Sequence, residues 1–198
     1  MTSYKTSRVI TVVFSLLLIA VAIAAVISFA RVFVFPSGSN KTSDADKSAL
    51  LNTSADRAVI MKVRGAIVAD ENFRSYQIKI SPNYRILTTY KGYKEDVLNE
   101  KKLNNNIPSY EQFVYALYHA NMIRGTELTG DANNTKGVCS DGELYEFKVL
   151  KDNESVKTLW TTSCSRIKGS LGVSKSALED LFIGQIPDAD DDYINDLW

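Results

Sequence analysis

The segment that most constrains the fold is the run of residues 10–30, which contains no charged side chain. Only Thr11, Ser15 and Ser28 interrupt its apolar character. A helix needs about 20 predominantly apolar residues to cross the hydrocarbon core of a bilayer. Arg31 follows directly, and a basic side chain at the end of a span can reach the lipid headgroups. The run therefore predicts one transmembrane helix that anchors the chain.

A cleaved signal peptide is the alternative interpretation of this segment, because Ser28-Phe29-Ala30 offers a small-residue cleavage site. The apolar run is longer than the 7–15 residues of a usual signal core, which favours an uncleaved signal-anchor. Basic residues lie on both sides of the span, so charge alone does not fix its orientation. The short head and the cysteines favour a single-pass protein of the cell membrane with residues 1–35 as cytoplasmic head and anchor.

The charge distribution argues against a nucleic-acid partner. The chain has a formal net charge of zero. Residues 1–35 carry three basic residues and no acidic residue, so the rest of the chain sums to −3. Nucleic-acid binding requires a basic face that releases phosphate counterions. The bilayer, contacted through residues 10–30, is therefore the one partner that the sequence predicts directly.

Composition divides the remainder of the chain into three parts. Residues 36–57 are rich in Ser, Thr, Asn, Asp and Lys and predict a flexible linker. A short helix around residues 47–51 is the alternative there. Residues 58–187 form the predicted globular extracytoplasmic domain. Residues 188–198 carry five aspartates and predict a solvated acidic tail.

Alternation of apolar and polar residues predicts the strands of the domain. In residues 59–64, Val59, Met61 and Val63 recur at every second position and so share one face of a strand. Residues 76–81 alternate in the same way, and a Pro-Asn turn signal separates them from the β-rich residues 85–91. These two runs predict a hairpin. A weaker strand is expected within residues 95–101.

Two helices are predicted from capping residues and helical spacing. Ser109 and Gln112 have the spacing of a capping box, with Pro108 just outside, and Gly125 can end this helix. A second helix begins near Ser174 and stops at Gly184. The expected fold class is α+β, an antiparallel sheet built from hairpins with two helices packed on it.

The strongest local signal is the pair Cys139 and Cys164, the only cysteines in the chain. Residues 143–150 and 155–162 are both β-like and are joined by a polar turn. A register that sets Phe147 opposite Val156 also sets the two cysteines opposite each other, within the Cα separation that a disulfide requires. We predict a disulfide and hence an oxidising compartment. Two reduced core thiols are the alternative.

No motif for catalysis, cofactor binding or metal ligation is present in the sequence. His119 is the only histidine, and its helix angle places it opposite the apolar stripe, so it should face solvent. Asp188, Asp190 and Asp192 match the first ligand positions of an EF-hand, but Tyr193 stands where Gly is required and no Glu follows. We predict no catalytic, cofactor or metal residues.

Four tyrosines are candidate exposed aromatics, which can stack on sugars or anchor a partner. They are Tyr90, Tyr93, Tyr115 and Tyr118. Packing under loops or against the sheet is the alternative role for them.

A set of short motifs forms a further pattern. They are Arg64-Gly65-Ala66-Ile67-Val68-Ala69-Asp70-Glu71, Ile78-Lys79-Ile80-Ser81, Cys139 with Leu144-Tyr145-Glu146-Phe147, Leu159-Trp160-Thr161-Thr162-Ser163-Cys164 and Gln185-Ile186-Pro187. The pattern resembles uncharacterised single-pass, membrane-anchored extracytoplasmic proteins of small-genome, host-attached bacteria. The resemblance covers residues 58–187 and implies an anchor, a tether and paired cysteines, without an activity.

Three functional hypotheses follow. The first is a non-catalytic binding or interaction module at the cell envelope, with a protein or a glycan as its partner. The second is an envelope hydrolase that uses Asp70, Glu71 or Asp141, since sites made of carboxylates leave little trace in a sequence. The absence of catalytic motifs favours the first, and a pocket with two carboxyl groups about 5–10 Å apart would favour the second. A subunit of a larger membrane complex is a third hypothesis, but the span lacks a Gly-x-x-x-Gly motif.

The anchor makes a direct prediction. The full-length chain should stay with membranes through a carbonate or high-salt wash, because an apolar helix in the bilayer core is not released by salt. The measurement is the distribution of the chain between pellet and supernatant. Release of a soluble species that begins at Arg31 would show a cleaved signal peptide instead.

Overall fold

The computed structural model describes residues 43–167, 169–189 and 193–197. The predicted span at residues 10–30 and the first part of the predicted linker lie outside these residues. Within the described residues, no helix combines the length and the apolar character needed to cross a membrane.

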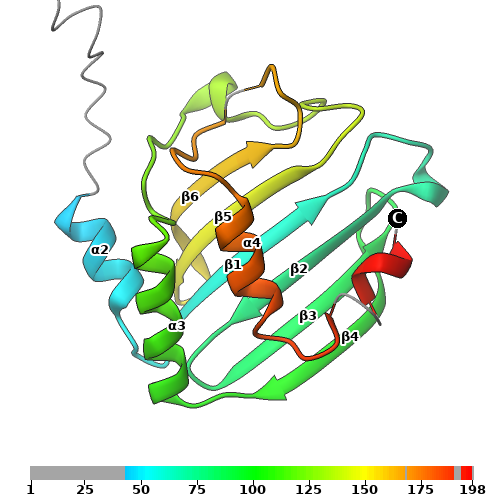
Figure 1. Ribbon diagram of the computed structural model, residues 1–198. Helices are drawn as coiled ribbons and strands as arrows, with labels where there is room; N and C mark the ends of the chain where they lie inside the picture. The colour runs from blue at the N-terminus through cyan, green and yellow to red at the C-terminus, as the bar shows by residue number, and fades with distance from the viewer. Residues whose placement is uncertain (1–42, 168, 190–192, 198) are drawn as a thin grey trace, which may run out of the picture. The chain divides into compact units, whose positions relative to one another are not determined.

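A six-stranded antiparallel sheet forms the centre of the domain, with the strand order β4-β3-β2-β1-β5-β6 (Figure 1). The strands are β1 (Arg57–Arg64), β2 (Arg74–Ile80), β3 (Tyr84–Lys91), β4 (Asp96–Asn104), β5 (Leu144–Lys151) and β6 (Glu154–Thr162). The predicted hairpin of residues 76–81 and 85–91 is confirmed as β2–β3. The weak strand predicted within residues 95–101 is also present and extends to Asn104.

Helices cover one face of the sheet, where α3 and α4 lie in front of the strands (Figure 1). The described residues contain α2 (Asp44–Leu51), α3 (Ile107–His119) and α4 (Ser176–Ile183), with short turns η1 (Asp70–Asn72), η2 (Gly130–Asn133) and η4 (Asn195–Leu197). The α+β class is therefore confirmed, with a third helix, α2, beside the two that the sequence predicts.

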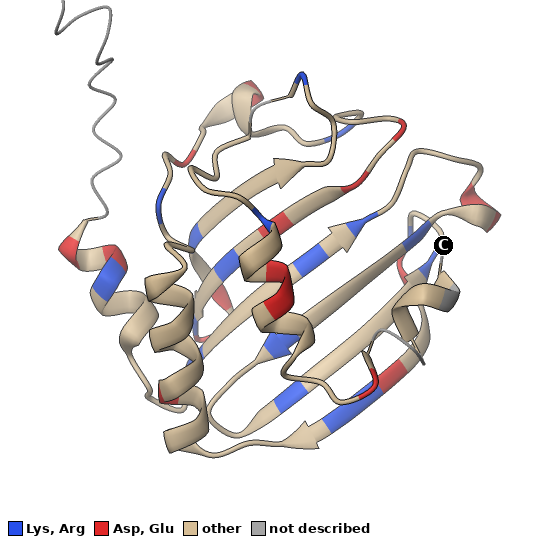
Figure 2. Cartoon of the chain, in the orientation of Figure 1, with Lys and Arg blue, Asp and Glu red and all other residues tan. Residues whose placement is uncertain are grey.

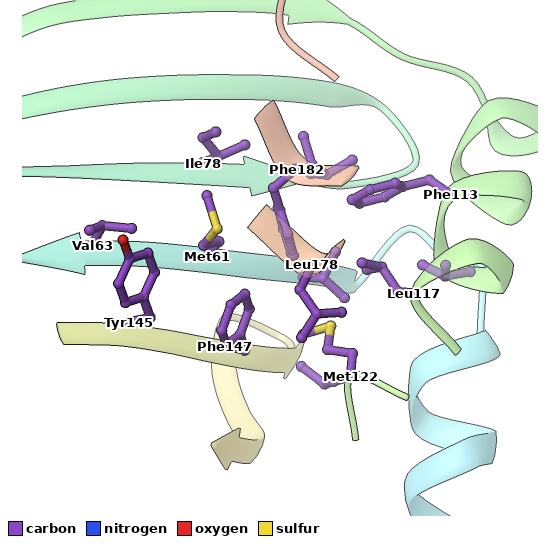
Figure 3. Close-up of a cluster of buried hydrophobic side chains, with 14 of the residues drawn as sticks. Met61, Val63, Ile78, Phe113, Leu117, Met122, Tyr145, Phe147, Leu178 and Phe182 are labelled. Atoms are coloured by element: carbon purple, nitrogen blue, oxygen red, sulfur yellow. The ribbon is translucent and has the colours of Figure 1, made fainter. Parts of the chain in front are cut away.

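The core lies between this face and the helices. Alternation along β1 turns Met61 and Val63 toward the helices, and both side chains are fully buried (Figure 3). Phe182 of α4 makes an edge contact with Phe113 of α3 at 5.3 Å between ring centroids. It also lies 6.1 Å from the ring of Phe147 on β5. Full burial of such side chains contributes about 1.5–3 kcal/mol each, so these contacts hold both helices to the sheet.

Helix α3 begins and ends differently from the prediction. The side chain of Asn106, and not that of Ser109, caps the helix by accepting a hydrogen bond from the Ser109 backbone N–H at 2.9 Å. Pro108 lies inside the first turn, where its missing N–H costs nothing because that group has no partner within the helix. At the other end α3 stops at His119, before the predicted stop at Gly125, and Asn121 takes the left-handed conformation with φ of 59°.

Within the predicted linker, Asp44–Leu51 forms helix α2, which agrees with the alternative of a short helix around residues 47–51. Ser43 caps α2 by accepting a hydrogen bond from the Asp46 N–H at 3.0 Å. Leu50 is fully buried in the core cluster. Asp46 pairs with Lys157 of β6 at 2.9 Å. The polar composition of the segment does not reveal this helix, because contacts with distant parts of the chain, among them the burial of Leu50 and the Asp46–Lys157 ion pair, attach it to the domain.

The described part of the C-terminal segment also packs on the core, so a fully solvated tail is wrong. Ala189, Ile194 and Leu197 are at most 8% exposed. They belong to the main core cluster. Lys101 of β4 donates to the carbonyl of Pro187 at 2.6 Å. The aspartates dominate the composition of this segment, but the apolar residues between them reach the core.

The attachment of α2 makes a stability prediction. Leu50→Ala should lower the free energy of unfolding of the full chain by about 2–5 kcal/mol, since it leaves a cavity at a fully buried position. Leu98→Ala is the matched control, because Leu98 is 39% exposed on β4 and should change stability by less than about 0.5 kcal/mol. Denaturant unfolding measures both. Equal effects of the two substitutions would show that α2 does not pack on the domain.

Candidate functional site

Cys139 and Cys164 form a disulfide, with 5.6 Å between their Cα atoms. The predicted pairing is confirmed, but both cysteines lie beyond the strands that were expected to align them. The last ladder pair is Leu144 with Thr162, and the next contact is the Ser163 N–H donating to the Glu143 carbonyl at 3.0 Å. The bridge therefore joins two loops at the end of the β5–β6 hairpin.

The predicted register of that hairpin is wrong. Phe147 lies opposite Leu159 and not opposite Val156. The turn consists of Asp152 and Asn153, with φ of 52° and 65°, the conformation of a type I′ hairpin turn. The register also shifts at a bulge near the turn. The displacement is an odd number of residues, so each β6 side chain lies on the face opposite to the predicted one. Leu159 is therefore buried at 1% exposure, while Val156 is 42% exposed.

The disulfide fixes a loop that reaches back to the central strand. From this loop Thr135 accepts a hydrogen bond from Arg64 Nη2 at 2.6 Å. The carbonyl of Ser140 accepts one from the Ile67 N–H at 2.8 Å. A side chain at Gly142 would collide with Ser163 Oγ and Cys139 Sγ, so the chain passes close to the bridge only because this residue is glycine. The loop at 135–140 is thereby held against the segment that follows β1.

A pocket of about 480 Å³ lies between these segments, and we call it the end pocket. Its walls come from the end of β1 with the segment after it, the β3–β4 turn and the loop at 135–138. The apolar lining residues are Ile67, Phe73, Tyr93, Val138 and Leu144. The polar lining residues include Arg64, Glu95, Thr135 and Lys136. The pocket therefore combines an apolar wall with charged groups.

The charged groups of the end pocket are only partly neutralised. Glu95 pairs with Lys62 of β1. Arg64 lies 3.6 Å from the carboxylate of Glu146, and its side chain is 26% exposed. Its Nε is buried and has no hydrogen-bond partner within the described residues. The exposed part of the Arg64 guanidinium can bind an anionic or carbonyl oxygen in the pocket.

The apolar wall is held by a network around Tyr93. Its ring stacks on Phe73 with 4.1 Å between centroids. Its hydroxyl donates to the Val68 carbonyl at 2.7 Å, and its backbone N–H donates to Asp70 Oδ1 at 2.7 Å. The Tyr93 side chain nevertheless remains 48% exposed, beside Ile67 at 46%. These contacts present a fixed aromatic and aliphatic surface at the mouth of the pocket.

Backbone strain is concentrated at the same place. Six described residues other than glycine have positive φ, and four of them are Asn or Asp, which tolerate that conformation. The other two are Glu95 and Cys139, with φ of 59° and 58°. Glu95 lines the end pocket, and Cys139 belongs to the loop that forms one wall. Strained residues of this kind cluster at ligand-binding sites, which supports the end pocket as the functional site.

The three carboxylates of the hydrolase hypothesis do not converge on a pocket. Asp70 accepts the Tyr93 N–H and so holds the β3–β4 turn. Glu71 lies in η1, and its carbonyl accepts a hydrogen bond from Arg74 at 2.7 Å. Asp141 lies 3.3 Å from the sulfur of Cys164. Four pockets found within the described residues are each lined by at most one carboxyl group.

Cys139, Asp141 and Cys164 place their ligand atoms within 4.8 Å of one another. Metal ions bind cysteine as thiolate, and the sulfurs of a disulfide are not thiolates. While the bridge is intact, this cluster therefore offers one carboxylate and no sulfur ligand. Its chemistry is that of a structural cross-link.

The other predicted residues lie elsewhere. His119 is exposed as predicted, with its ring 4.5 Å from that of Tyr115 on α3. Lys47 of α2 lies over the ring of Tyr118. Burial raises the pKa of Tyr90 above its ordinary value, so this phenol stays protonated. Of the three aspartates compared with an EF-hand, only Asp188 lies within the described residues, 3.8 Å from Lys101.

Sequence patterns did not identify Arg64, Glu95 and Thr135 as pocket residues, because they belong to three separate segments. The one available signal is Gly92, whose positive φ of 68° lets the chain turn so that Tyr93 and Glu95 reach the pocket.

Comparison with protein-family models and with curated proteins finds no match to this chain.

The disulfide leads to a stability prediction for this site. Cys139→Ala with Cys164→Ala should lower the free energy of unfolding by about 3–4 kcal/mol in the chain-entropy model, given the sequence separation of 25 residues. Denaturant unfolding measures the loss, and a non-reduced digest should yield one linked peptide pair. Free alkylation of both thiols in native protein taken from its own cell would contradict the bridge and the extracytoplasmic location together.

Proposed function

We propose that this chain is a membrane-anchored, non-catalytic binding module of the cell envelope whose ligand occupies the end pocket. The observation that carries the proposal is the combination, in one pocket, of the exposed ring of Tyr93 and the partly exposed guanidinium of Arg64. Binding pockets typically join apolar lining to a few placed polar groups. Among the described residues, Glu95 is the one carboxylate that lines this pocket, so the arrangement supports retention of a ligand.

The ligand chemistry follows from the two walls. Phe73 and Tyr93 favour a flat apolar or sugar-like group, which gains from stacking on an aromatic ring. Arg64 and Lys136 favour a carboxylate or phosphate at the other side. A ligand with one apolar part and one anionic part satisfies both walls, whereas a purely apolar ligand would displace water from the charged groups of the pocket without replacing its hydrogen bonds.

The proposed location rests on three features. The uncharged run at residues 10–30 provides an anchor, and the disulfide belongs to an oxidising compartment. The resemblance to membrane-anchored extracytoplasmic proteins of host-attached bacteria points the same way. We therefore propose that the domain faces the outside of the cell membrane, where envelope material can reach the end pocket.

A pair of tyrosine variants tests the proposed site. A photo-crosslinking amino acid at Val68, beside the pocket, should form an adduct with envelope material of the chain's own cell. Tyr93→Ala should reduce that adduct roughly tenfold, the effect of losing about 1.4 kcal/mol of binding. The measurement is the yield of crosslinked species from full-length protein in native membranes.

Tyr115→Ala is the matched control, since Tyr115 is 57% exposed on α3 and does not line the pocket. It should leave the adduct unchanged. Tyr93→Ala also loses the stack on Phe73 and the hydrogen bond to Val68, so cooperative denaturant unfolding of each variant must show that both are folded under the crosslinking conditions. Equal yields from the Tyr93 and Tyr115 variants would reject the end pocket as the binding site.

A further inference from the structure

The face of the sheet that the helices leave open carries a row of three lysines. In the strand register Lys148 of β5 lies beside Ile60 of β1, which lies beside Lys79 of β2. The row continues through Ile86 of β3 to Lys102 of β4. Cations and isoleucines thus alternate across five neighbouring strands, and Figure 2 shows basic positions on several strands of the sheet.

The spacing of this lysine row is set by the sheet. Neighbouring strands lie about 4.8 Å apart, so lysines on every second strand repeat at about 10 Å. Ile60 is only 8% exposed although it lies on the face that no described helix covers, because it packs in a second apolar cluster with Ala58 and Leu150. The stems of neighbouring lysines can cover such apolar side chains while their ammonium groups stay in water.

Two of these charges are left without a carboxylate. Both Lys79 and Lys102 hold their Nζ over the ring of Tyr84, at 5.8 and 5.4 Å from its centroid. Lys79 also donates to Asn153 Oδ1 at 2.8 Å. Among the described residues, neither ammonium has a carboxylate oxygen within 4.0 Å, whereas Lys148 lies 3.6 Å from Glu146. Two like charges share one aromatic ring, and an anion between them would relieve their repulsion.

The cationic row contrasts with the rest of the domain. The chain has a net charge of zero and its first 35 residues carry a charge of +3, so residues 36–198 carry a net charge of −3. General attraction would therefore not draw a polyanion to this domain. Binding would have to come from a local arrangement of cations, and the lysine row supplies one.

We propose that the lysine row binds an extended, flexible polyanion that crosses the strands, a polymer with repeated phosphate or carboxylate groups. Adjacent strands are rotated by about 20–25° relative to each other. Over the four steps from β5 to β4, the direction in which side chains leave the sheet therefore turns by roughly 80–100°. A flat bilayer cannot meet all three lysines on a surface twisted to this degree, and neither can a stiff duplex. A flexible chain can follow the twist and place an anionic group at each cation.

The test uses the full-length chain in a neutral detergent, with linear polyphosphate and poly-L-glutamate as probes. Titration should show binding to at least one probe at low salt and a linear fall of log K with log salt concentration, as expected for release of counterions. Lys79→Gln with Lys102→Gln should weaken binding at least tenfold.

The control is Lys91→Gln with Lys94→Gln, two exposed lysines near the β3–β4 turn that lie outside the row. It removes the same charge and should change the affinity less than twofold, with unfolding midpoints equal among all variants. Equal weakening by both double variants would overturn the proposal, as would absence of binding to both polymers. Tighter binding to anionic vesicles or to duplex DNA than to either polymer would also overturn it.

Discussion

The structure depends on β1, which pairs with β2 on one side and with β5 on the other. Because successive side chains of a strand point to opposite faces, this one strand supplies both surfaces of the domain. Met61 and Val63 build the core under the helices, and Ile60 lies within the lysine row. The strand ends at Arg64, which reaches the end pocket. A shift of one residue in its register would exchange the core with the open face and abolish both candidate sites.

The sequence predicted the elements whose signal is local. Alternation located β1, β2 and β3, and helical spacing located α3 and α4. It failed where a detail depends on backbone conformation, as in the β5–β6 hairpin. The turn there consists of Asp152 and Asn153, and a bulge adds a further shift. The cysteine pairing was predicted correctly from a wrong register, because the bridge joins loop positions beyond the last ladder pair, which need no direct opposition in the ladder.

Tertiary contacts account for what composition could not reveal. Helix α2 is attached through Leu50 and the Asp46–Lys157 ion pair, whose partners lie 111 positions apart. The C-terminal segment is held by Ile194 and Leu197 between acidic residues. The end pocket is a stronger case, since Arg64 and Thr135 are 71 positions apart. No local motif reports such a site, because its residues become neighbours only when the sheet forms.

The disulfide makes the shape of the end pocket depend on whether the surrounding compartment keeps cysteines oxidised. The loop at 135–141 has no strand or helix, and the described hydrogen bonds that tie it to the β1 side are Arg64 to Thr135 and Ile67 to Ser140. Each such bond contributes about 0.5–1.5 kcal/mol net, less than the entropy of ordering the several residues of the loop. The bridge supplies the remaining restraint, and Cys139 accepts a strained backbone to make it. Reduction would therefore loosen the wall that carries Thr135 and Val138 before it affected the buried core. A pocket built in this way is complete only where thiols are oxidised, so the location of the domain is a physical condition for the binding activity proposed for it.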